Sequence, residues 1–237
     1  MKKVAIIQSN YIPWKGYFDI INSVDEFVLY DDVQYTRRDW RNRNKIKTVS
    51  GTRWLTIPVS VSGKYFQLIK DTEVFEKGWG LNHFEILRQS YSSAKYWNEN
   101  ADWLKSLYED AEKLTHLSHI NKLFIDAICK QLQITTRISF SSQYELSPGR
   151  SEKLFSVCKA LDADVYVSGP AAKNYLDESI FNEQGMQVEW FDYGEYPSYP
   201  QVHPPFEHAL SILDLILNVG PDATQYMNSF KMKSSIK

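Results

Sequence analysis

The stretch Val4-Ala5-Ile6-Ile7-Gln8-Ser9-Asn10, near the N-terminus, decides the fold. Its four consecutive apolar residues predict a short strand that is buried on both faces, and the polar residues after Ile7 end that strand. Residues 15–23 carry apolar side chains at helical spacing, and Phe27-Val28-Leu29-Tyr30 repeats the pattern of a buried strand. A strand, a crossover helix and a second strand predict a parallel α/β unit.

The remaining segments extend this unit. Residues 53–61 alternate in polarity and predict a strand, with residues 65–70 as its hairpin partner. Apolar residues at i, i+3 and i+4 predict three helices, at 79–92, 94–114 and 118–132. The last third of the chain predicts strands at 137–140, 164–167 and 188–191, and helices at 151–161, 170–176 and 208–218.

The prediction is therefore an α/β protein with a mostly parallel sheet and an inserted helical subdomain. Its parts are an N-terminal α/β part at 1–78, a helical insertion or lid at 79–135, a C-terminal α/β part at 136–230 that completes the same domain, and a flexible tail at 231–237. A chain of 237 residues can bury a large core without disulfides.

Composition limits the function classes. The net charge of −2 gives no overall basicity that would favour nucleic acid or an anionic membrane. Two cysteines, Cys129 and Cys158, exclude a disulfide scaffold, and both fall on predicted apolar helix faces. No stretch approaches the roughly 18 apolar residues of a membrane span, and the N-terminal apolar run is too short for a signal peptide. We expect a cytoplasmic protein without membrane insertion and without a metal site.

Unusual chemistry follows the predicted strands, where open parallel sheets bind ligands. The first such segment contains Gln8, Asn10, Tyr11 and Trp14, and it opens a helix that begins with glycine in its first turn. Helix N-termini attract phosphate. The placement resembles the phosphate-binding turn of nucleotidylyltransferases, but the histidines of that turn are absent. The alternative is a turn whose aromatic side chains pack on the sheet.

The second segment is rich in cations. Between residues 37 and 47, six arginines and lysines are concentrated in a nearly neutral chain, and Trp40 lies among them. Arginine binds phosphate bidentately, so we expect Arg37 and Arg43 to contact a phosphorylated ligand. Asp31 and Asp32 could bind a sugar hydroxyl, accept a proton from an amine, or hold Mg²⁺ beside a phosphate. The alternative is a helix or a solvated loop with internal charge pairs.

Asp32 is the better candidate for a catalytic base, because it follows a buried strand that holds its main chain at the ligand edge. Asp31 should point to the other side and could be structural. A third segment adds a basic loop with Arg150 and a small-residue loop with Ser168.

The proline-rich loop at 196–205 contributes one more set of candidates. Tyr199, Gln201 and His203 alternate in an extended chain and so face one way. The loop follows the strand at 188–191 and should leave from the same edge of the sheet as the N-terminal loops. We expect these three residues to form one pocket with residues 8–17 and the two aspartates, with His203 as a second catalytic candidate and the helical middle as a wall or lid.

Several of these blocks resemble the WbqC-like protein family. The resemblance rests on residues 7–21, on Asp31-Asp32-Val33-Gln34-Tyr35, on Trp40-Arg41-Asn42-Arg43-Asn44 and on shorter blocks as far as residue 214. It implies pocket roles for a set of residues, namely Gln8, Tyr11, Tyr17, Asp31, Asp32, Tyr35, Trp40, Asn42, Arg43 and Asn44. It does not implicate Lys15, because that position often looks apolar in the family.

The resemblance also implies a role in bacterial surface-polysaccharide synthesis. The expected activity is transfer of an acyl or aminoacyl group, for example glycyl, to the amine of a nucleotide-linked amino sugar. ATP with Mg could activate the carboxylate, or an aminoacyl-tRNA could donate the group. The alternative is a non-catalytic partner that binds a nucleotide sugar or glycan, which would need the same aromatics and arginines but no acid–base pair.

Overall fold

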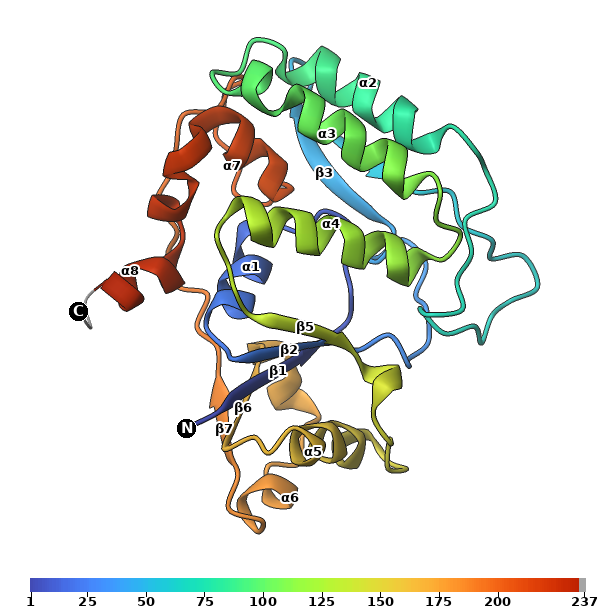
Figure 1. The fold of residues 1–237 in the computed structure, drawn as a ribbon, viewed down its shortest axis with the longest axis vertical. Coiled ribbons are helices and arrows are strands. Elements are labelled where there is room, and N and C mark those ends of the chain that lie inside the picture. Colours follow the sequence, from blue (N-terminus) through green and yellow to red (C-terminus); the bar gives the residue numbers. More distant parts are fainter. Residues whose placement is uncertain (235–237) are drawn as a thin grey trace.

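The computed structural model describes residues 1–234 and contains a five-stranded, all-parallel sheet (Figure 1). Its strands lie in the order β5-β2-β1-β6-β7. Their bounds are β1 at Lys3–Ile7, β2 at Glu26–Leu29, β5 at Arg137–Phe140, β6 at Val165–Ser168 and β7 at Gln187–Trp190. The predicted α/β class and parallel sheet are confirmed.

The order of the strands reverses between β1 and β6. Helix α1 (Lys15–Asn22) leads from β1 to β2, and β5 lies beyond β2 on the same side. The chain then returns through the short helix η1 (Ser141–Gln143) and helix α5 (Arg150–Ala160) to β6, on the other side of β1. The segments η2 (Pro170–Asn174) and α6 (Ser179–Asn182) connect β6 to β7. Such a reversal is where doubly wound sheets bind ligands.

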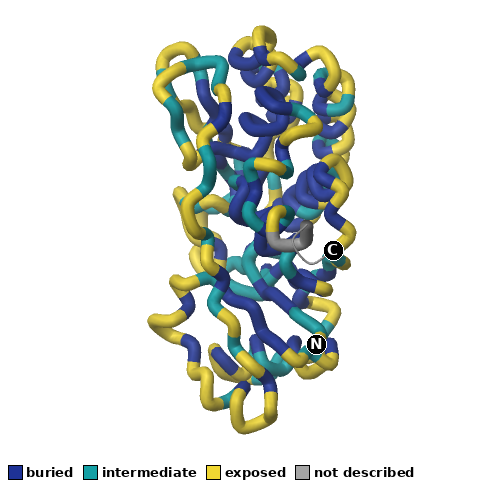
Figure 2. The backbone as a smooth tube through the Cα atoms, turned by 90° about the vertical axis from the view of Figure 1, so that its left-hand side faces the viewer, coloured by how far each residue is buried: buried dark blue, intermediate teal, exposed yellow. Residues whose placement is uncertain are grey.

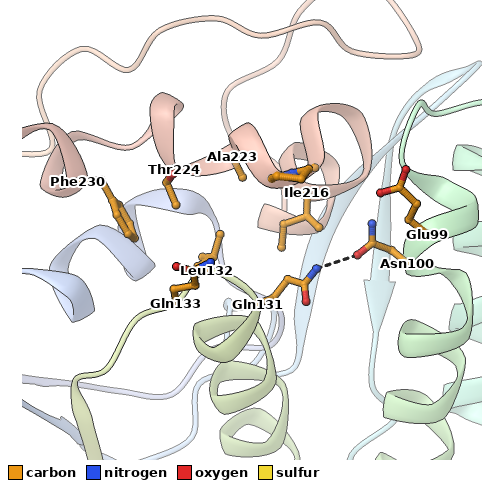
Figure 3. A pocket seen from close by; sticks show the side chains of 11 residues that line it. Glu99, Asn100, Gln131, Leu132, Gln133, Ile216, Ala223, Thr224 and Phe230 are labelled. Carbon is orange, nitrogen blue, oxygen red and sulfur yellow. Dashed lines mark hydrogen bonds between the residues drawn. The ribbon is translucent and has the colours of Figure 1, made fainter.

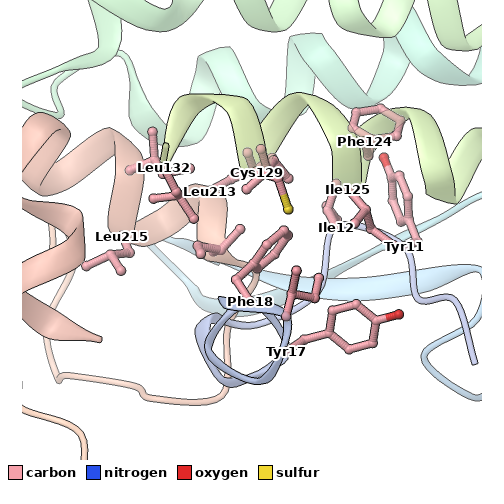
Figure 4. Packing of buried hydrophobic residues seen from close by; sticks show 14 of the residues in the cluster. Tyr11, Ile12, Tyr17, Phe18, Phe124, Ile125, Cys129, Leu132, Leu213 and Leu215 are labelled. Carbon is pink, nitrogen blue, oxygen red and sulfur yellow. The ribbon is translucent and has the colours of Figure 1, made fainter. Parts of the chain in front are cut away.

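Both faces of the sheet are covered, because alternate residues of each strand enter different cores. In β1, Ala5 belongs to a large buried cluster, whereas Val4 and Ile6 belong to a smaller one that includes residues of α5 and α6. The large cluster joins α1 to α4 (Leu117–Gln131), and Figure 4 shows Phe18 and Cys129 within it. Figure 2 shows the buried segments running through the interior with exposed loops around them.

The connection from β2 to β5 is long. It holds the hairpin β3 (Arg43–Thr48) and β4 (Gly51–Thr56), then helices α2 (Trp79–Tyr91), α3 (Trp97–Ala111) and finally α4. Residues of all three helices share the large cluster with α1 and the sheet. The helical middle thus packs on the same core as the strands.

Strand β3 is the main correction to the predicted elements. No strand was predicted over residues 43–48, and residues 65–70 were expected to pair with 53–61; instead β4 pairs antiparallel with β3. The inward positions of β3 are Asn44 and Ile46, both buried, so only one of them is apolar. An amide in an inward position hides the alternation on which strand prediction depends.

The C-terminal segment also differs in detail. Helix α7 runs over Ile212–Val219 rather than from residue 208, because Ser211 caps it by accepting a hydrogen bond from the Leu213 N–H at 3.3 Å. The segments η3 (Gly220–Tyr226) and α8 (Asn228–Ser234) follow. The predicted tail therefore begins as helix, and its residues 235–237 lie outside the described part. Within residues 1–234, no helix is long and apolar enough to cross a membrane.

Candidate functional site at the carboxyl edge of the sheet

A cavity of about 450 Å³ lies at the reversal point of the sheet, and we call it the edge cavity. The ends of three neighbouring strands supply Ile7 and Gln8, Tyr30, and Ser168 and Gly169. The full lining is Ile6, Ile7, Gln8, Tyr30, Val33, Gln34, Arg150, Leu154, Tyr166, Ser168, Gly169, Ala171, Ala172, Tyr175 and Tyr193.

The chemistry of the edge cavity is aromatic and weakly polar with one cation. Arg150, the first residue of α5, lies with its guanidinium carbon 3.8 Å from the centre of the Tyr175 ring. Burial, with a smaller contribution from Asp32, raises the pKa of Tyr30 to about 12, so this phenol stays protonated and can donate a hydrogen bond. The combination suits a ligand with a flat ring and a phosphate.

The loop after β1 is held by buried hydrogen bonds from distant segments. The Ser9 N–H donates to Asp31 Oδ1 at 2.9 Å, and Ser9 Oγ accepts from Asn121 Nδ2 at 2.9 Å. The Gln8 carbonyl accepts from the Tyr17 hydroxyl at 3.0 Å. The loop that carries Gln8 is therefore fixed by contacts within the chain.

Further along, the same loop contains a strained residue. Ile12 has a φ of 37°, a region that β-branched residues rarely adopt. The Asn44 side chain donates to the carbonyl oxygens of Tyr11 and Ile12, at 3.2 and 3.0 Å. The Tyr11 N–H donates to the Trp40 carbonyl at 3.1 Å. Strain that is held in place by such contacts is typical of functional loops.

Several predicted pocket residues are parts of this scaffold. Tyr11 is fully buried, with its hydroxyl 2.9 Å from both His83 Nδ1 and the Tyr108 hydroxyl. Asn42 donates to the Ile57 carbonyl at 2.8 Å. Burial raises the pKa of Asp31, although hydrogen bonds from Ser118 and Ser9 oppose the shift. Tyr11 and Asp31 thus support the loop, and for Asp31 this is the structural role that the sequence left open, whereas Asn42 bonds to the segment after β4.

Asp32 lies near the carboxyl end of β5. Its carboxylate forms an ion pair with Lys70 and accepts a hydrogen bond from the Ser141 hydroxyl at 2.6 Å. The edge cavity is lined by its neighbours Tyr30 and Val33. Asp32 is thus beside the cavity, and its charge is already compensated.

A second, smaller cavity of about 260 Å³ lies beside the N-terminal loop. It is lined by Asn10, Pro13, Trp14, Trp40, Asn44 and Ala209, and we call it the tryptophan cavity. Four of the predicted site residues meet there, and three others (Gln8, Arg150 and Ser168) line the edge cavity.

The cations of residues 37–47 point in different directions. Arg37 donates to the Val61 carbonyl at 2.7 Å and lines a third cavity, of about 330 Å³, together with Tyr35. Arg43 stacks 4.1 Å from the Trp54 ring centre and donates to the Arg38 carbonyl. Arg41, one of the six cations but not one of the predicted site residues, donates to Asn10 and approaches the Gln8 and Ser9 carbonyls at 3.4 Å.

The proline-rich loop does not join its three candidates to Asp32, which corrects the single-pocket expectation. Tyr199 and Gln201 donate to Asp214 Oδ2 of α7, each at 2.8 Å, and His203 Nε2 lies 2.9 Å from the Ser90 carbonyl. The loop does contact the N-terminal segment, because the Tyr196 ring centre lies 5.5 Å from that of Trp14, and Lys15 Nζ lies 3.4 Å from the Pro197 oxygen and 5.0 Å from the Tyr199 ring centre. The three side chains instead anchor the loop to α7 and α2.

Other cavities lie away from the strand ends. Figure 3 shows one of about 470 Å³ between α3, α4 and the segment that follows α7, where Gln131 donates to Asn100 at 3.1 Å. Gln201 lines another, of about 510 Å³. The first contains none of the predicted site residues, and neither lies at the reversal of strand order, so we place the site at the edge cavity.

The described residues 1–234 hold no cluster of three or more His, Cys, Asp and Glu that could bind a metal ion. The lining of the edge cavity also lacks a carboxylate among these residues. The side chains at the edge cavity therefore do not fit Mg²⁺ bound beside a phosphate.

Sequence reasoning missed Tyr175 and Tyr193 in the wall of the edge cavity. Tyr175 stacks with Arg150 from a segment that carries no motif of its own. Tyr30 and Gln34 could have been predicted as lining residues, because both lie within two residues of the predicted Asp31-Asp32 pair.

The fold and the edge cavity define a doubly wound parallel α/β protein with a cavity at its strand reversal. Within that class, the chain belongs to the WbqC-like protein family, whose model matches residues 8–226. It is 50% identical over 227 residues to the uncharacterized protein Rv1507c of Mycobacterium tuberculosis (strain ATCC 25618 / H37Rv), an alignment that covers 96% of this chain and 98% of that relative. The comparison with solved structures finds no match.

Proposed function

We propose that this protein is a cytoplasmic transferase that joins an acyl or aminoacyl group, such as glycyl, to the amine of a nucleotide-linked amino sugar for surface-polysaccharide synthesis. The observation that carries the proposal is the edge cavity at the strand reversal, where Arg150 and an aromatic wall meet three strand ends. The acyl chemistry comes from the resemblance to the family rather than from the cavity.

The edge cavity suits the nucleotide half of such a substrate. Gly169 presents main chain without a side chain at the end of β6, and Arg150 opens α5, so backbone and guanidinium are both near the space for a phosphate. Tyr30 and Tyr175 offer flat faces beside it.

Asp32 remains the predicted base for the attacking amine. Its carboxylate is paired with Lys70 and is not part of the cavity lining. The side chains at the edge cavity do not fit Mg²⁺, so we derive no step through ATP and take the donor to be an already activated acyl group, such as an aminoacyl-tRNA.

The second candidate function is a non-catalytic partner that binds a nucleotide sugar or glycan. One observation favours it: the compensated charge of Asp32 leaves the edge cavity with amides, phenols and one arginine, which bind but do not abstract a proton from an amine.

The two functions are separated by a binding experiment followed by a product assay. Thermal shift with UDP-linked and dTDP-linked amino sugars reports binding. Mass spectrometry after incubation with glycyl-tRNA reports an amide product. Arg150→Ala should weaken nucleotide-sugar binding by about 1.5–3 kcal/mol. The matched control is Arg137→Ala, an exposed arginine at the start of β5 on the opposite edge.

Equal losses in the two variants, or no binding by the wild type, would refute the proposal. Binding without product would support the non-catalytic partner.

A further inference from the structure

The tryptophan cavity and the edge cavity are neighbours. Gln8 lines the edge cavity and Asn10, two residues later, lines the tryptophan cavity. The Trp14 ring of the tryptophan cavity lies 5.4 Å, centre to centre, from the Tyr193 ring of the edge cavity. One extended ligand that runs alongside the Trp14 and Tyr193 rings could therefore occupy both cavities.

The walls of the tryptophan cavity are ordered by contacts behind them. Trp14 is flanked by the Tyr193 and Tyr196 rings, at 5.4 and 5.5 Å, and its indole covers Gly16, where a Cβ would lie 2.3 Å from a ring atom. The main chain of Trp40 is fixed by the hydrogen bond from the Tyr11 N–H. The Trp14 indole and the Trp40 main chain are thus held in place before any ligand arrives, which lowers the entropy cost of binding.

A buried cation, Arg41, contacts the loop residues between Gln8 of the edge cavity and Asn10 of the tryptophan cavity. Arg41 approaches the Gln8 and Ser9 carbonyls and donates to Asn10. Its only ion pair in the described part of the chain is with Asp39 at 3.7 Å, and its buried Nε has no hydrogen-bond partner there. A buried guanidinium that is only partly compensated favours an anionic group nearby, such as a diphosphate.

We propose that the tryptophan cavity binds the sugar ring of the nucleotide-linked substrate, while the edge cavity binds its nucleoside. This inference rests on the proposed function. An indole is a flat apolar face, which matches the C–H face of a pyranose, and the same face attracts an ammonium group of an amino sugar. The Asn10 amide at the rim can bond a hydroxyl. The two cavities would thus divide one substrate into its two halves.

The chain offers a matched pair of variants. Trp40 and Trp54 are 39% and 38% exposed, and their ring centres lie 5.2 Å apart, but only Trp40 lines the cavity. Calorimetry compares UDP with UDP-glucosamine, and dTDP with a dTDP-linked amino hexose, in the wild type, Trp40→Ala and Trp54→Ala. A separate titration follows quenching of tryptophan fluorescence by free glucosamine.

In the wild type, the sugar should improve affinity over the free nucleotide at least several-fold. Trp40→Ala should abolish most of that gain and leave the affinity for the free nucleotide within about twofold, and Trp54→Ala should leave both affinities nearly unchanged. Equal effects of the two variants, or a sugar that adds no affinity, would overturn the inference.

The outcomes also separate this inference from the proposed function. Nucleotide binding without a gain from the sugar rejects the sugar site and retains the nucleotide site. Quenching by glucosamine that depends on Trp40, without binding of either nucleotide, rejects the proposed function and retains the sugar site.

Discussion

The side chain of Asn44 donates to the carbonyl of Ile12 at 3.0 Å, and Ile12 is a β-branched residue with a φ of 37°. A strand of the hairpin therefore clamps a strained point in the loop that separates the two cavities. The same amide also holds the Tyr11 carbonyl. Such a clamp fixes where Asn10 and Trp14 lie, because they flank the two clamped residues.

Asn44→Ala should release this loop. Two buried carbonyls would lose their donor, so the free energy of unfolding should fall by about 1–3 kcal/mol, measured in urea. Asn42→Ala is the control, because Asn42 is equally buried but donates to Ile57, away from the loop. Both variants should lose stability, but only Asn44→Ala should also weaken ligand binding; equal binding losses would mean that the clamp has no special role.

Gly16→Ala should displace Trp14, because the added Cβ would lie 2.3 Å from the indole. Crowding of this kind costs about 1–3 kcal/mol of unfolding free energy, and the emission spectrum of Trp14 should shift. The double-mutant cycle with Trp14→Ala tests the cause. In the Trp14→Ala background, alanine at position 16 should be neutral or stabilising, since alanine favours a helix over glycine by about 1 kcal/mol. A cost that persists without the indole would contradict the contact.

The parallel sheet could be predicted because each of its inner strands is a short unbroken apolar run. Strand β3 could not, since its inward Asn44 bonds to carbonyls 32 and 33 residues away in the sequence. Nothing in the local sequence pattern distinguishes a side-chain amide that hydrogen-bonds to the main chain from one that hydrogen-bonds to a ligand. The same ambiguity made Tyr11 look like a pocket residue, although its hydroxyl partners come from α2 and α3.

The candidate site was only partly predictable, because it too depends on pairing between segments that are far apart in the sequence. Gln8 follows β1 and Ser168 ends β6, so the rule for carboxyl edges places them at the same edge. That they line one cavity depends on β1 pairing with β6, which lies more than 150 residues later and on the far side of the reversal. Tyr175 and Tyr193 depend on that pairing as well, and therefore no motif revealed them.

Asp32→Asn tests the predicted base. If Asp32 takes the proton of the attacking amine, turnover should fall by about 10²-fold or more while the fold survives. Lys70→Met is the comparison, because it removes the ion pair but keeps the carboxylate. A base role predicts a much smaller loss in Lys70→Met than in Asp32→Asn. Similar losses of turnover in the two variants would show that turnover depends on the ion pair rather than on Asp32 acting as a base.

Lys15→Met tests the cost of a buried cation. Lys15 is 3% exposed, and its ammonium lies 4.9 and 5.0 Å from the Tyr196 and Tyr199 ring centres. Burial lowers the pKa of Lys15 to about 8, against a usual 10.5, although Asp19 and Asp214 oppose the shift. Below pH 8 both the folded and unfolded states carry the proton, so the full cost of burying the charge opposes folding.

Between pH 8 and 10.5 the unfolded chain holds more protons at Lys15 than the folded one, so its contribution to stability rises with pH through this window. Lys15→Met should therefore be more stable than the wild type at pH 7, by about 1–2 kcal/mol after allowance for the opposing contacts, and the difference should shrink toward pH 10. Urea denaturation at each pH measures it, with the exposed Lys105→Met as the control. A variant that is less stable by a constant amount at every pH would show that the contacts with the two tyrosine rings outweigh the cost of burial.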